Sequence, residues 1–174
     1  QGRGDAERPL GDRGSALAGL ERGASHLKAL VTGAHGFAGS WLAKALLADG
    51  ASVVVFGRGE PAISGLALQG IESEVDDVSG DLRDFSALSK ALKGVDAVFH
   101  LAAQTIVGTA NSSPLPTFET NIQGTWTLLE ACRHHTPGTK VVYASTRQIY
   151  GRPDALPVTE RHLVRPTDVN GINK

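Results

Sequence analysis

The stretch LKALVTGAHGFAGSWLAKAL (residues 27–46) decides how this sequence folds. It joins a continuous apolar run to a helical pattern through a turn with glycine at positions 33, 36 and 39. Gly33 permits a tight turn, Gly36 lets a ligand approach the backbone, and Gly39 lets the helix pack closely on the strand. A helix that starts here directs unpaired N–H groups at a bound phosphate. The stretch therefore predicts a strand, a phosphate-binding turn and a helix, and the alternative is a glycine-rich turn without a ligand.

Similar apolar runs recur along the chain after this first unit. We predict buried strands at Leu27–Thr32, Ser52–Phe56, Ala97–Leu101 and Val141–Ser145, with a weaker strand near Ile71–Val75. The runs are continuous rather than alternating, which is typical of a parallel sheet covered on both faces. Strands that alternate with helical patterns indicate an α/β fold, here a doubly wound parallel sheet of the Rossmann type.

Three apolar stripes at helical spacing lie between the predicted strands. Their members, stripe by stripe, are Phe37, Trp41, Leu42, Ala45 and Leu46; Phe85, Leu88 and Leu92; and Ile122, Trp126, Leu129 and Cys132. Gly50 ends the first helix and Pro137-Gly138 ends the third, while Asp84 is the predicted N-cap of the second. We expect each stripe to face the sheet.

The composition excludes several classes of protein. The 174 residues carry 17 Lys and Arg against 18 Asp and Glu, which gives a formal net charge of −1 and no basic surface for nucleic acid. No apolar run reaches the roughly 18 residues of a membrane span. The single cysteine excludes an internal disulfide, and no Cys/His cluster has the spacing of a metal site. We predict a cytoplasmic globular protein without a metal, a membrane span or a nucleic-acid partner.

Residues 1–26 differ in composition from the rest of the chain. They are rich in glycine, arginine and acidic residues and contain few aliphatic side chains, so they can bury little apolar surface. They also lack the apolar centre of a signal peptide. We therefore predict a flexible extension at residues 1–26, followed by a single nucleotide-binding domain from residue 27 to residue 174.

Four further segments follow the glycine turn in order. They are GDLRD (80–84), VFHLAA (98–103), NIQGT (121–125) and STRQIYG (145–151). Together with the Gly-x-x-Gly-x-x-Gly turn and Phe37 after its central glycine, they resemble the extended short-chain dehydrogenase/reductase superfamily. The resemblance is to its NAD-dependent epimerase/dehydratase group, which includes the nucleotide-sugar epimerases, and it covers residues 28–174.

The resemblance implies an NAD(P) site. The cofactor-binding residues it implies are Gly33, Gly36, Phe37, Gly39, Arg58, Asp81, Leu82, Leu101, Ala102, Ala103, Asn121 and Lys174. Asp81 would hold the adenine ring, although an aspartate there also suits a simple turn. Ala102 and Ala103 would leave room for the ribose and nicotinamide, or would merely pack tightly. Asn121 would support the backbone of the active site, or cap the helix that follows. His100 lies inside a predicted strand, so we expect it to be a buried core histidine.

The residues that select between NAD and NADP are expected at the end of the second predicted strand. An acidic residue there binds the ribose 2′-hydroxyl of NAD, and a nearby arginine accepts the 2′-phosphate of NADP. Gly57 occupies the acidic position and Arg58 follows it, which favours NADP; Glu60 is an acidic residue that could still serve NAD.

The catalytic residues implied by the resemblance are Thr146, Lys174 and the residue four positions before this lysine. In the family that residue is a tyrosine that exchanges a proton while the lysine lowers its pKa and holds the nicotinamide ribose. Here it is Asn170, and an amide does not exchange a proton near neutral pH. Asp168 is the nearest titratable side chain, and its ordinary pKa suits a base better than an acid.

The residues after Thr146 restrict the reaction. Sugar 4,6-dehydratases of the group have Asp-Glu at these two positions, whereas this chain has Arg147 and Gln148. Neither side chain carries a proton in and out at neutral pH, which disfavours dehydration. Arg147 is either a solvated charge or a contact to a substrate phosphate or hydroxyl. We expect an epimerase or oxidoreductase acting on a nucleotide-linked sugar; the alternatives are a cofactor-binding or redox-sensing module without turnover, and a steroid- or flavonoid-type reductase.

Alignment on the motifs also predicts how far the fold extends. The chain is expected to cover only the first five strands of the family's sheet and to stop at Lys174, without a substrate-binding part. We expect such a fragment to be inactive alone and, with an apolar fifth strand at the edge, to be marginally stable and prone to aggregation. A homodimer is expected only of a full-length protein.

Overall fold

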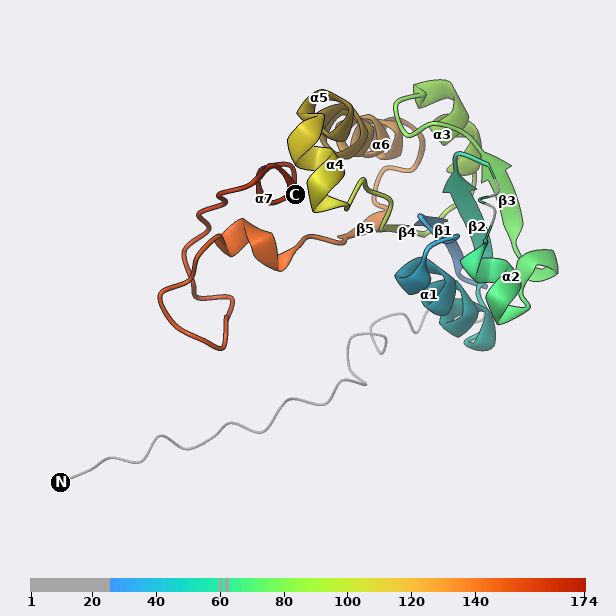
Figure 1. The fold of residues 1–174 in the computed structure, drawn as a ribbon. Coiled ribbons are helices and arrows are strands. Elements are labelled where there is room, and N and C mark those ends of the chain that lie inside the picture. Colours follow the sequence, from blue (N-terminus) through green and yellow to red (C-terminus); the bar gives the residue numbers. More distant parts are fainter. Residues whose placement is uncertain (1–25, 60, 62) are drawn as a thin grey trace.

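The computed structural model describes residues 26–59, 61 and 63–174, so the flexible extension predicted at residues 1–26 lies outside the described residues except for His26. Five parallel strands form one sheet in the order β3-β2-β1-β4-β5 (Figure 1). The strands are β1 (Lys28–Thr32), β2 (Ser52–Gly57), β3 (Asp76–Ser79), β4 (Ala97–His100) and β5 (Lys140–Tyr143). This order places the first strand at the centre, with the chain winding outward on both sides, as a doubly wound sheet requires.

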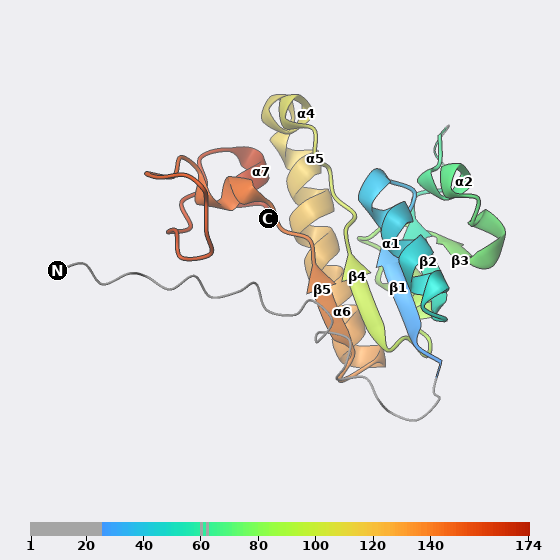
Figure 2. The ribbon, with the colours of Figure 1, turned by 90° about the horizontal axis from the view of Figure 1, so that it is seen from below.

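Helices cover both faces of the sheet (Figures 1 and 2). The α-helices are α1 (Phe37–Ala48), α2 (Gly65–Gln69), α3 (Phe85–Ala91), α4 (Val107–Ser112), α5 (Pro114–Phe118), α6 (Gly124–His135) and α7 (Val169–Ile172). The other helical segments are the 3₁₀ turns η2 (Glu72–Glu74) and η4 (Arg147–Tyr150) and the π-helical η3 (Glu119–Gln123). Since α5, η3 and α6 follow one another without a break, they form one long helical rod behind β4 and β5.

Alternate residues of the central strand enter two separate cores. Leu30 packs with apolar side chains of α3 and α6, such as Leu88 and Leu128. Its neighbour Val31 packs on the other face of the sheet with side chains of α1 and α2. Successive side chains of a strand point to opposite faces, so a sheet buried on both faces needs a continuous apolar run. This confirms the fold class predicted from the unbroken apolar strands.

Four of the five predicted strands lie within two residues of their predicted bounds, and the third was predicted wrongly. The prediction put it near Ile71–Val75, but η2 occupies residues 72–74 and β3 begins at Asp76. Ile71 is apolar because it is buried in the core beside Leu66, not because it belongs to a strand. The true strand lies at the edge of the sheet with most of its side chains exposed, so its sequence carries no apolar run.

The inward faces predicted for two helices are confirmed only in part. On α1, Leu46 of the predicted stripe is buried and Leu42 packs against the core, but Phe37 and Trp41 are exposed and the small residues Gly39 and Ala43 face the sheet. In the stripe predicted across η3 and α6, Cys132 is buried but Ile122, Trp126 and Leu129 are exposed, while Thr127, Leu128 and Ala131 are buried. Close packing of these helices on the strands favours small side chains over large aromatic ones. In α3 the prediction is confirmed in part: Leu88 and Leu92 are buried, Phe85 is partly exposed, and Asp84 caps the helix.

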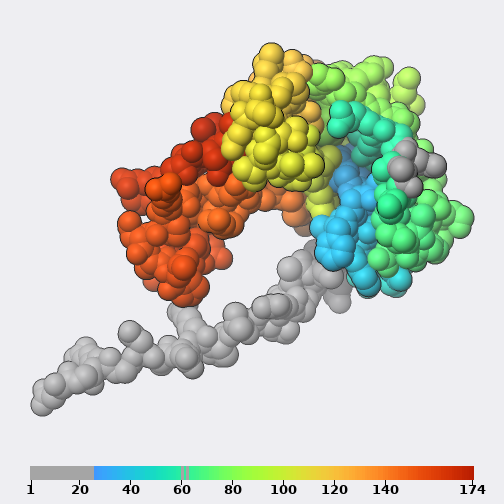
Figure 3. All heavy atoms as spheres, viewed as in Figure 1, coloured from blue at the N-terminus to red at the C-terminus, as the bar shows by residue number. Residues whose placement is uncertain are grey.

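The chain after β5 leaves the sheet and forms a separate arm, residues 144–174 (Figures 2 and 3). The arm contains η4 and α7 and otherwise has no regular secondary structure. It returns at α7 to lie against α4. β5 itself is an edge strand, and Val142 on it is 54% exposed. No helix among the described residues combines the length and apolar character needed to cross a membrane.

Candidate functional site

A cleft of about 820 Å³ opens at the carboxyl ends of the central strands. In open α/β sheets this edge, where the strand order reverses, is the usual place for a ligand, and the volume suits a cofactor or drug-sized molecule. Ten of the twelve predicted cofactor residues line the cleft: Gly33, Gly36, Phe37, Gly39, Arg58, Asp81, Leu82, Leu101, Ala102 and Ala103. The other two, Asn121 and Lys174, lie outside its lining.

The glycine turn forms the part of the cleft between β1 and α1. Gly33 has φ +75°, and a Cβ there would lie 2.8 Å from the backbone nitrogen of Ala102. A Cβ on Gly39 would collide with the Gly33 carbonyl and with Ala34 Cα. The Gly36 N–H donates to the Gly33 carbonyl at 3.1 Å, which closes the turn. Backbone conformation and contact distance therefore both require glycine at position 33, and contact distance alone requires it at position 39.

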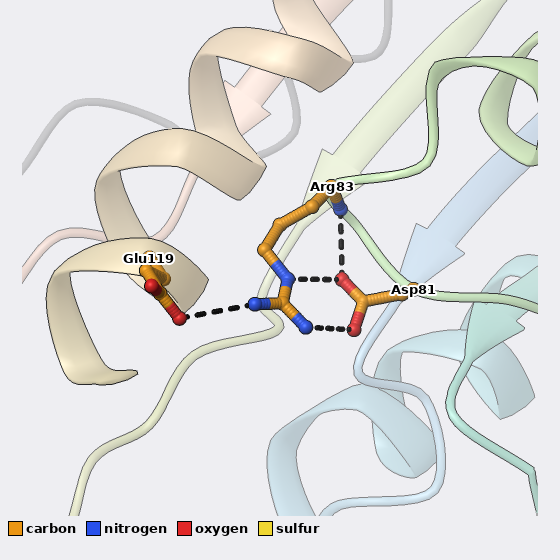
Figure 4. A network of polar contacts seen from close by, with 3 residues as sticks. All are labelled: Asp81, Arg83 and Glu119. Atoms are coloured by element: carbon orange, nitrogen blue, oxygen red, sulfur yellow. Dashed lines mark hydrogen bonds and ion pairs between the residues drawn. The ribbon is translucent and has the colours of Figure 1, made fainter. Parts of the chain in front are cut away.

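The segment after β3 forms the next wall of the cleft. Asp81 Oδ1 accepts hydrogen bonds from the backbone nitrogen and Nε of Arg83, each at 2.9 Å, and Oδ2 accepts one from Nη2 at 2.9 Å (Figure 4). Arg83 Nη1 donates to Glu119 Oε2 at 3.1 Å. The bond to Arg83 lowers the pKa of Asp81 to about 2. These hydrogen bonds are the contacts of an aspartate that forms a turn. The Asp81 side chain also borders the cleft, as the adenine-binding alternative requires.

The end of β2 carries the residues expected to select the cofactor. Arg58 is exposed and lines the cleft, whereas Glu60 lies outside the described residues. His35 also lines the cleft, although no sequence motif singled it out. Its Nδ1 lies 3.0 Å from Ser64 Oγ and its Nε2 lies 3.1 Å from Asp77 Oδ2. His35 therefore ties the glycine turn to the start of α2 and to the edge strand β3.

Behind the cleft, a buried polar chain starts at β1. The Ala102 N–H donates to Thr32 Oγ1 at 3.1 Å, and this hydroxyl lies 2.7 Å from His100 Nδ1. His100 Nε2 lies 2.9 Å from Thr125 Oγ1 on α6. Burial, with a smaller contribution from the charge of Lys174, lowers the pKa of His100 to about 4. His100 is a neutral core histidine with both ring nitrogens hydrogen-bonded, as predicted.

Asn121 links the rod of helices to the cleft rim and to the arm. Its Oδ1 accepts from the Gln104 N–H at 2.8 Å, and its Nδ2 donates to the Gln104 carbonyl at 3.0 Å and to Asn173 Oδ1 at 3.0 Å. It lies inside η3 and caps no helix, which excludes the capping interpretation. The contacts instead match a side chain that supports the backbone beside the site.

The three predicted catalytic residues lie in the arm. Thr146 caps η4 by accepting from the Gln148 N–H. Lys174 Nζ donates to the Ala144 carbonyl at 2.8 Å and stands 4.8 Å from the centre of the Tyr143 ring, and burial lowers the pKa of this lysine. Asn170 is 5% exposed, and its Nδ2 donates to the Thr105 carbonyl at 3.1 Å. Thr105 lines the cleft, so Asn170 joins the arm to the cleft wall.

Asp168 and the two residues after Thr146 lie in the arm, outside the lining of the cleft. Asp168 Oδ1 caps α7 by accepting from the Gly171 N–H at 2.8 Å, and its Oδ2 accepts from Gln148 Nε2 at 3.0 Å. This carboxylate is therefore committed to holding η4 and α7 together. Arg147 belongs to η4 in the arm and does not line the cleft.

Sequence reasoning missed Thr105 and Thr120 as well as His35 in the lining of the cleft. The two threonines lie in the β4–α4 connection and in η3, outside the quoted motifs. Only Thr120 offered a signal, since it directly precedes Asn121 in the motif of residues 121–125. Thr105 can be recognised as part of the site only from the structure, in which its carbonyl accepts a hydrogen bond from Asn170, 65 residues later in the chain.

The parallel strand order, the glycine turn at the sheet's carboxyl edge and the adjoining cleft define the class of this protein: a Rossmann-type domain of the short-chain dehydrogenase/reductase kind. Residues 30–174 match the protein family described as GDP-mannose 4,6 dehydratase. The chain belongs to this family of NAD-dependent epimerases and dehydratases.

Individual relatives agree with this assignment. UDP-glucose 4-epimerase of Halalkalibacterium halodurans is 33% identical over 147 residues, which are 83% of this chain and 42% of the relative. The crystal structure of UDP-glucose 4-epimerase from Brucella ovis in complex with NAD has a TM-score of 0.75 at 32% identity, covering 84% of this chain and 44% of that one. For the dTDP-glucose 4,6-dehydratase DesIV from Streptomyces venezuelae with NAD bound, the TM-score is 0.76 at 33% identity, with 85% and 48% covered. The chain thus spans less than half the length of these relatives.

Proposed function

We propose that this chain is the cofactor-binding part of an NAD(P)-dependent enzyme that epimerises, oxidises or reduces a nucleotide-linked sugar. The observation that carries the proposal is the cleft lined by ten predicted cofactor residues, with the arm that holds Thr146 and Lys174 attached to its wall at Thr105. The epimerases and dehydratases among its relatives, some of them solved with NAD, support the same activity.

The residues present fit a dinucleotide. The glycine turn forms a cradle that a Cβ at position 33 or 39 would fill, and it leads into the N-terminus of α1, where backbone N–H groups favour phosphate. Asp81 and Leu82 would hold the adenine, and Ala102 with Ala103 would border the nicotinamide ribose. When bound, the nicotinamide ring accepts a hydride from a sugar carbon or returns one to it.

The arm would orient the sugar beside this ring. Lys174 would hold the nicotinamide ribose from the carboxyl end of β5, and the Thr146 hydroxyl would bind the reacting sugar oxygen. Asn170 holds α7 against the Thr105 carbonyl and supplies no titratable proton. Because Arg147 and Gln148 stand where an acid and a base would be needed, we propose epimerisation or redox chemistry rather than 4,6-dehydration.

We further propose NADP as the preferred cofactor. Arg58 is exposed at the cleft directly after Gly57, so its guanidinium can pair with a 2′-phosphate, and Gly57 offers no carboxylate for a 2′-hydroxyl. The NAD found in the solved relatives makes this a discriminating test. Calorimetric titration of the chain with NAD⁺ and NADP⁺ should give the lower Kd for NADP⁺, and tighter binding of NAD⁺ would overturn the preference.

The activity itself is tested in two steps. Binding of either dinucleotide is measured on this chain, and reduction of bound NAD(P)⁺ by a panel of nucleotide sugars is followed at 340 nm on the full product of the gene. Reduction of the bound dinucleotide by at least one nucleotide sugar supports the proposed enzymatic activity. Binding without reduction or epimerisation across the panel identifies a cofactor-binding module without turnover, and absence of binding rejects the proposal.

For the whole protein we propose a homodimer. Ile122, Trp126 and Leu129 form a partly exposed apolar face on η3 and α6, a type of surface that marks an interaction site. Light scattering coupled to size-exclusion chromatography should give twice the protomer mass, and a monomer at micromolar concentration would contradict this.

A further inference from the structure

Two buried side-chain atoms at α7 have no hydrogen-bond partner among the described residues. They are the acceptor Asn170 Oδ1 and the donor Asn173 Nδ2. The two asparagines are 5% and 4% exposed, so bulk solvent does not satisfy these atoms. A buried polar atom without a partner costs free energy, and the great majority of such atoms in proteins are paired with the protein or with ordered water. An acceptor and a donor left in one place indicate a molecule that can both donate and accept.

Rotating either amide would not remove these two unpaired atoms. Asn170 Nδ2 donates to the Thr105 carbonyl at 3.1 Å, so a rotated amide would place its oxygen against another acceptor. Asn173 Oδ1 accepts from Asn121 Nδ2 at 3.0 Å. The orientation of Asn121 is fixed in turn, because its amide donates to the Gln104 carbonyl and accepts from the Gln104 N–H. Backbone groups of the cleft wall thus determine which atom of each amide stays unpaired.

The two asparagines face the same part of the molecule. They are three residues apart along the turn of α7 and its C-cap, a spacing that makes side chains neighbours on one face of a helix. Asn170 contacts the β4–α4 connection at Thr105, and Asn173 contacts it at Gln104 through Asn121. We propose that Asn170 and Asn173 form a binding site for one water molecule, which donates to Asn170 Oδ1, accepts from Asn173 Nδ2 and fastens α7 to the wall of the cleft.

The identity of the occupant follows from the two groups that would bind it. Neither asparagine lines the cleft, so a ligand the size of a nucleotide or sugar does not reach them there. A bare cation has no use for the Asn173 donor, and a simple anion would be repelled by the Asn170 acceptor. The adjacent charge, that of Lys174, is directed at the Ala144 carbonyl instead. Water meets both requirements, since it donates and accepts and is commonly held in proteins by two to four polar groups.

The site concerns the attachment of the arm, and so it goes beyond the proposed function and does not depend on it. The arm carries Thr146 and Lys174 and returns to the rest of the molecule where α7 lies against α4. A water bound between Asn170 and Asn173 would be shared by the two side chains. Loss of either asparagine would therefore release the same water, and the two residues would act as one unit in holding the arm.

Nuclear Overhauser spectroscopy between water and this chain tests the site directly. The Asn173 Nδ2 protons should show a cross-peak to water with the sign of a molecule bound for longer than about a nanosecond. The side-chain amide of Asn111, exposed on α4, is the control and should show only the weak effect of surface water. A cross-peak at Asn173 no stronger than that at Asn111 would overturn the inference, and this measurement needs no substitution.

A double-mutant cycle supplies the second readout, with the rate of trypsin cleavage after Arg161 as the measure of arm detachment. N170A and N173A each remove one direct hydrogen bond together with the shared water. The water is lost only once in the double variant. Its acceleration should therefore be about fivefold smaller than the product of the two single accelerations, the equivalent of one hydrogen bond. Accelerations that multiply without this deficit would show that no molecule is shared and would refute the site.

Discussion

The cleft and the arm are held in place by different kinds of contact. In the cleft, main-chain atoms pack directly against one another. The glycine turn lies against Ala102 and against the start of α1, with no space for a Cβ. The arm is attached by side-chain hydrogen bonds, chiefly those of Asn170 to Thr105 and Asn121 to Asn173. Close-packed backbone tolerates almost no change, whereas a side-chain hydrogen bond adds only about 1 kcal/mol. The part that binds the cofactor is thus rigid, and the part that carries the catalytic stretch is loosely fastened.

The largest expected effect comes from adding one methyl group to the glycine turn. Gly39→Ala places a Cβ against the Gly33 carbonyl and Ala34 Cα, so the turn between β1 and α1 must open. We expect a loss of about 3 kcal/mol in the free energy of unfolding, measured by urea denaturation, with loss of dinucleotide binding. Gly108→Ala in α4 is the matched control, because nothing lies within 4 Å of a Cβ there and alanine favours a helix. Equal stability of the two variants would show that the turn is not closely packed.

His100 lies where the two regions meet, between Thr32 of the cleft and Thr125 of the rod. Its pKa is about 4 in the folded protein and 6.5 in an unfolded chain, so the unfolded state binds more protons between these values. The contribution of His100 to the free energy of unfolding should therefore be fully present above pH 6.5, and the free energy of unfolding should fall by about 3 kcal/mol as the pH drops toward 4.

Urea denaturation at a series of pH values measures this dependence. His100→Gln should remove most of it while keeping hydrogen bonds to both threonines, and His135→Gln, on an exposed site, should leave it intact. In the NMR spectrum of the folded protein, titration of the assigned His100 imidazole near 6.5 would be inconsistent with a buried neutral His100.

Loosening the arm should have a smaller effect. Asn170→Ala leaves the Thr105 carbonyl without its donor and should cost about 1–2 kcal/mol in the docking of α7. Trypsin cleavage after Arg161 should become about five- to tenfold faster, because the arm detaches more often. Asn111→Ala, at an exposed position of α4, is the control. An unchanged cleavage rate would mean that Asn170 does not hold the arm.

The smallest expected effect concerns cofactor preference. Arg58→Ala should change the free energy of unfolding by less than about 0.5 kcal/mol, since Arg58 is exposed. It should nevertheless lower the affinity for NADP⁺ relative to NAD⁺ about five- to tenfold, because one charge-assisted contact to the 2′-phosphate is lost. Calorimetry with both dinucleotides measures the ratio, with Arg161→Ala in the arm as control. A ratio that does not move would assign the preference to residues other than Arg58.

The difference between the regions also explains what the sequence could predict. The buried strands and the glycine turn are local features, since burial on both faces demands continuous apolar runs and a positive φ demands glycine. The edge strand β3 escaped prediction because exposed strands need no apolar side chains. The inward faces of α1 and α6 were predicted only in part: Leu46 and Cys132 are buried as expected, but small residues such as Ala43 and Ala131 also pack on the sheet while the aromatic ones face outward.

In the site, the residues of the motifs could be assigned to the cleft because strands of a parallel sheet end at a common edge. The contacts of the arm could not be predicted, because they join residues far apart in sequence. Asn121 lies 52 residues from Asn173, and nothing local to either residue indicates the contact. The substitution of asparagine at position 170 was visible in the sequence, but its contact with the Thr105 carbonyl emerges only from the fold.

The central position of β1 has a consequence for the order of events during synthesis. Its partner β2 follows after 24 residues, but its other partner β4 pairs Ala29 with Ala97, 68 residues later. At the usual rates of translation, about 5–20 residues per second, one edge of β1 therefore waits on the order of 3–14 s for its partner to be made. During that interval the apolar side chains that will form the core beside α3 and α6 stand uncovered on the nascent chain, which exposes the first strand to aggregation while it is being made.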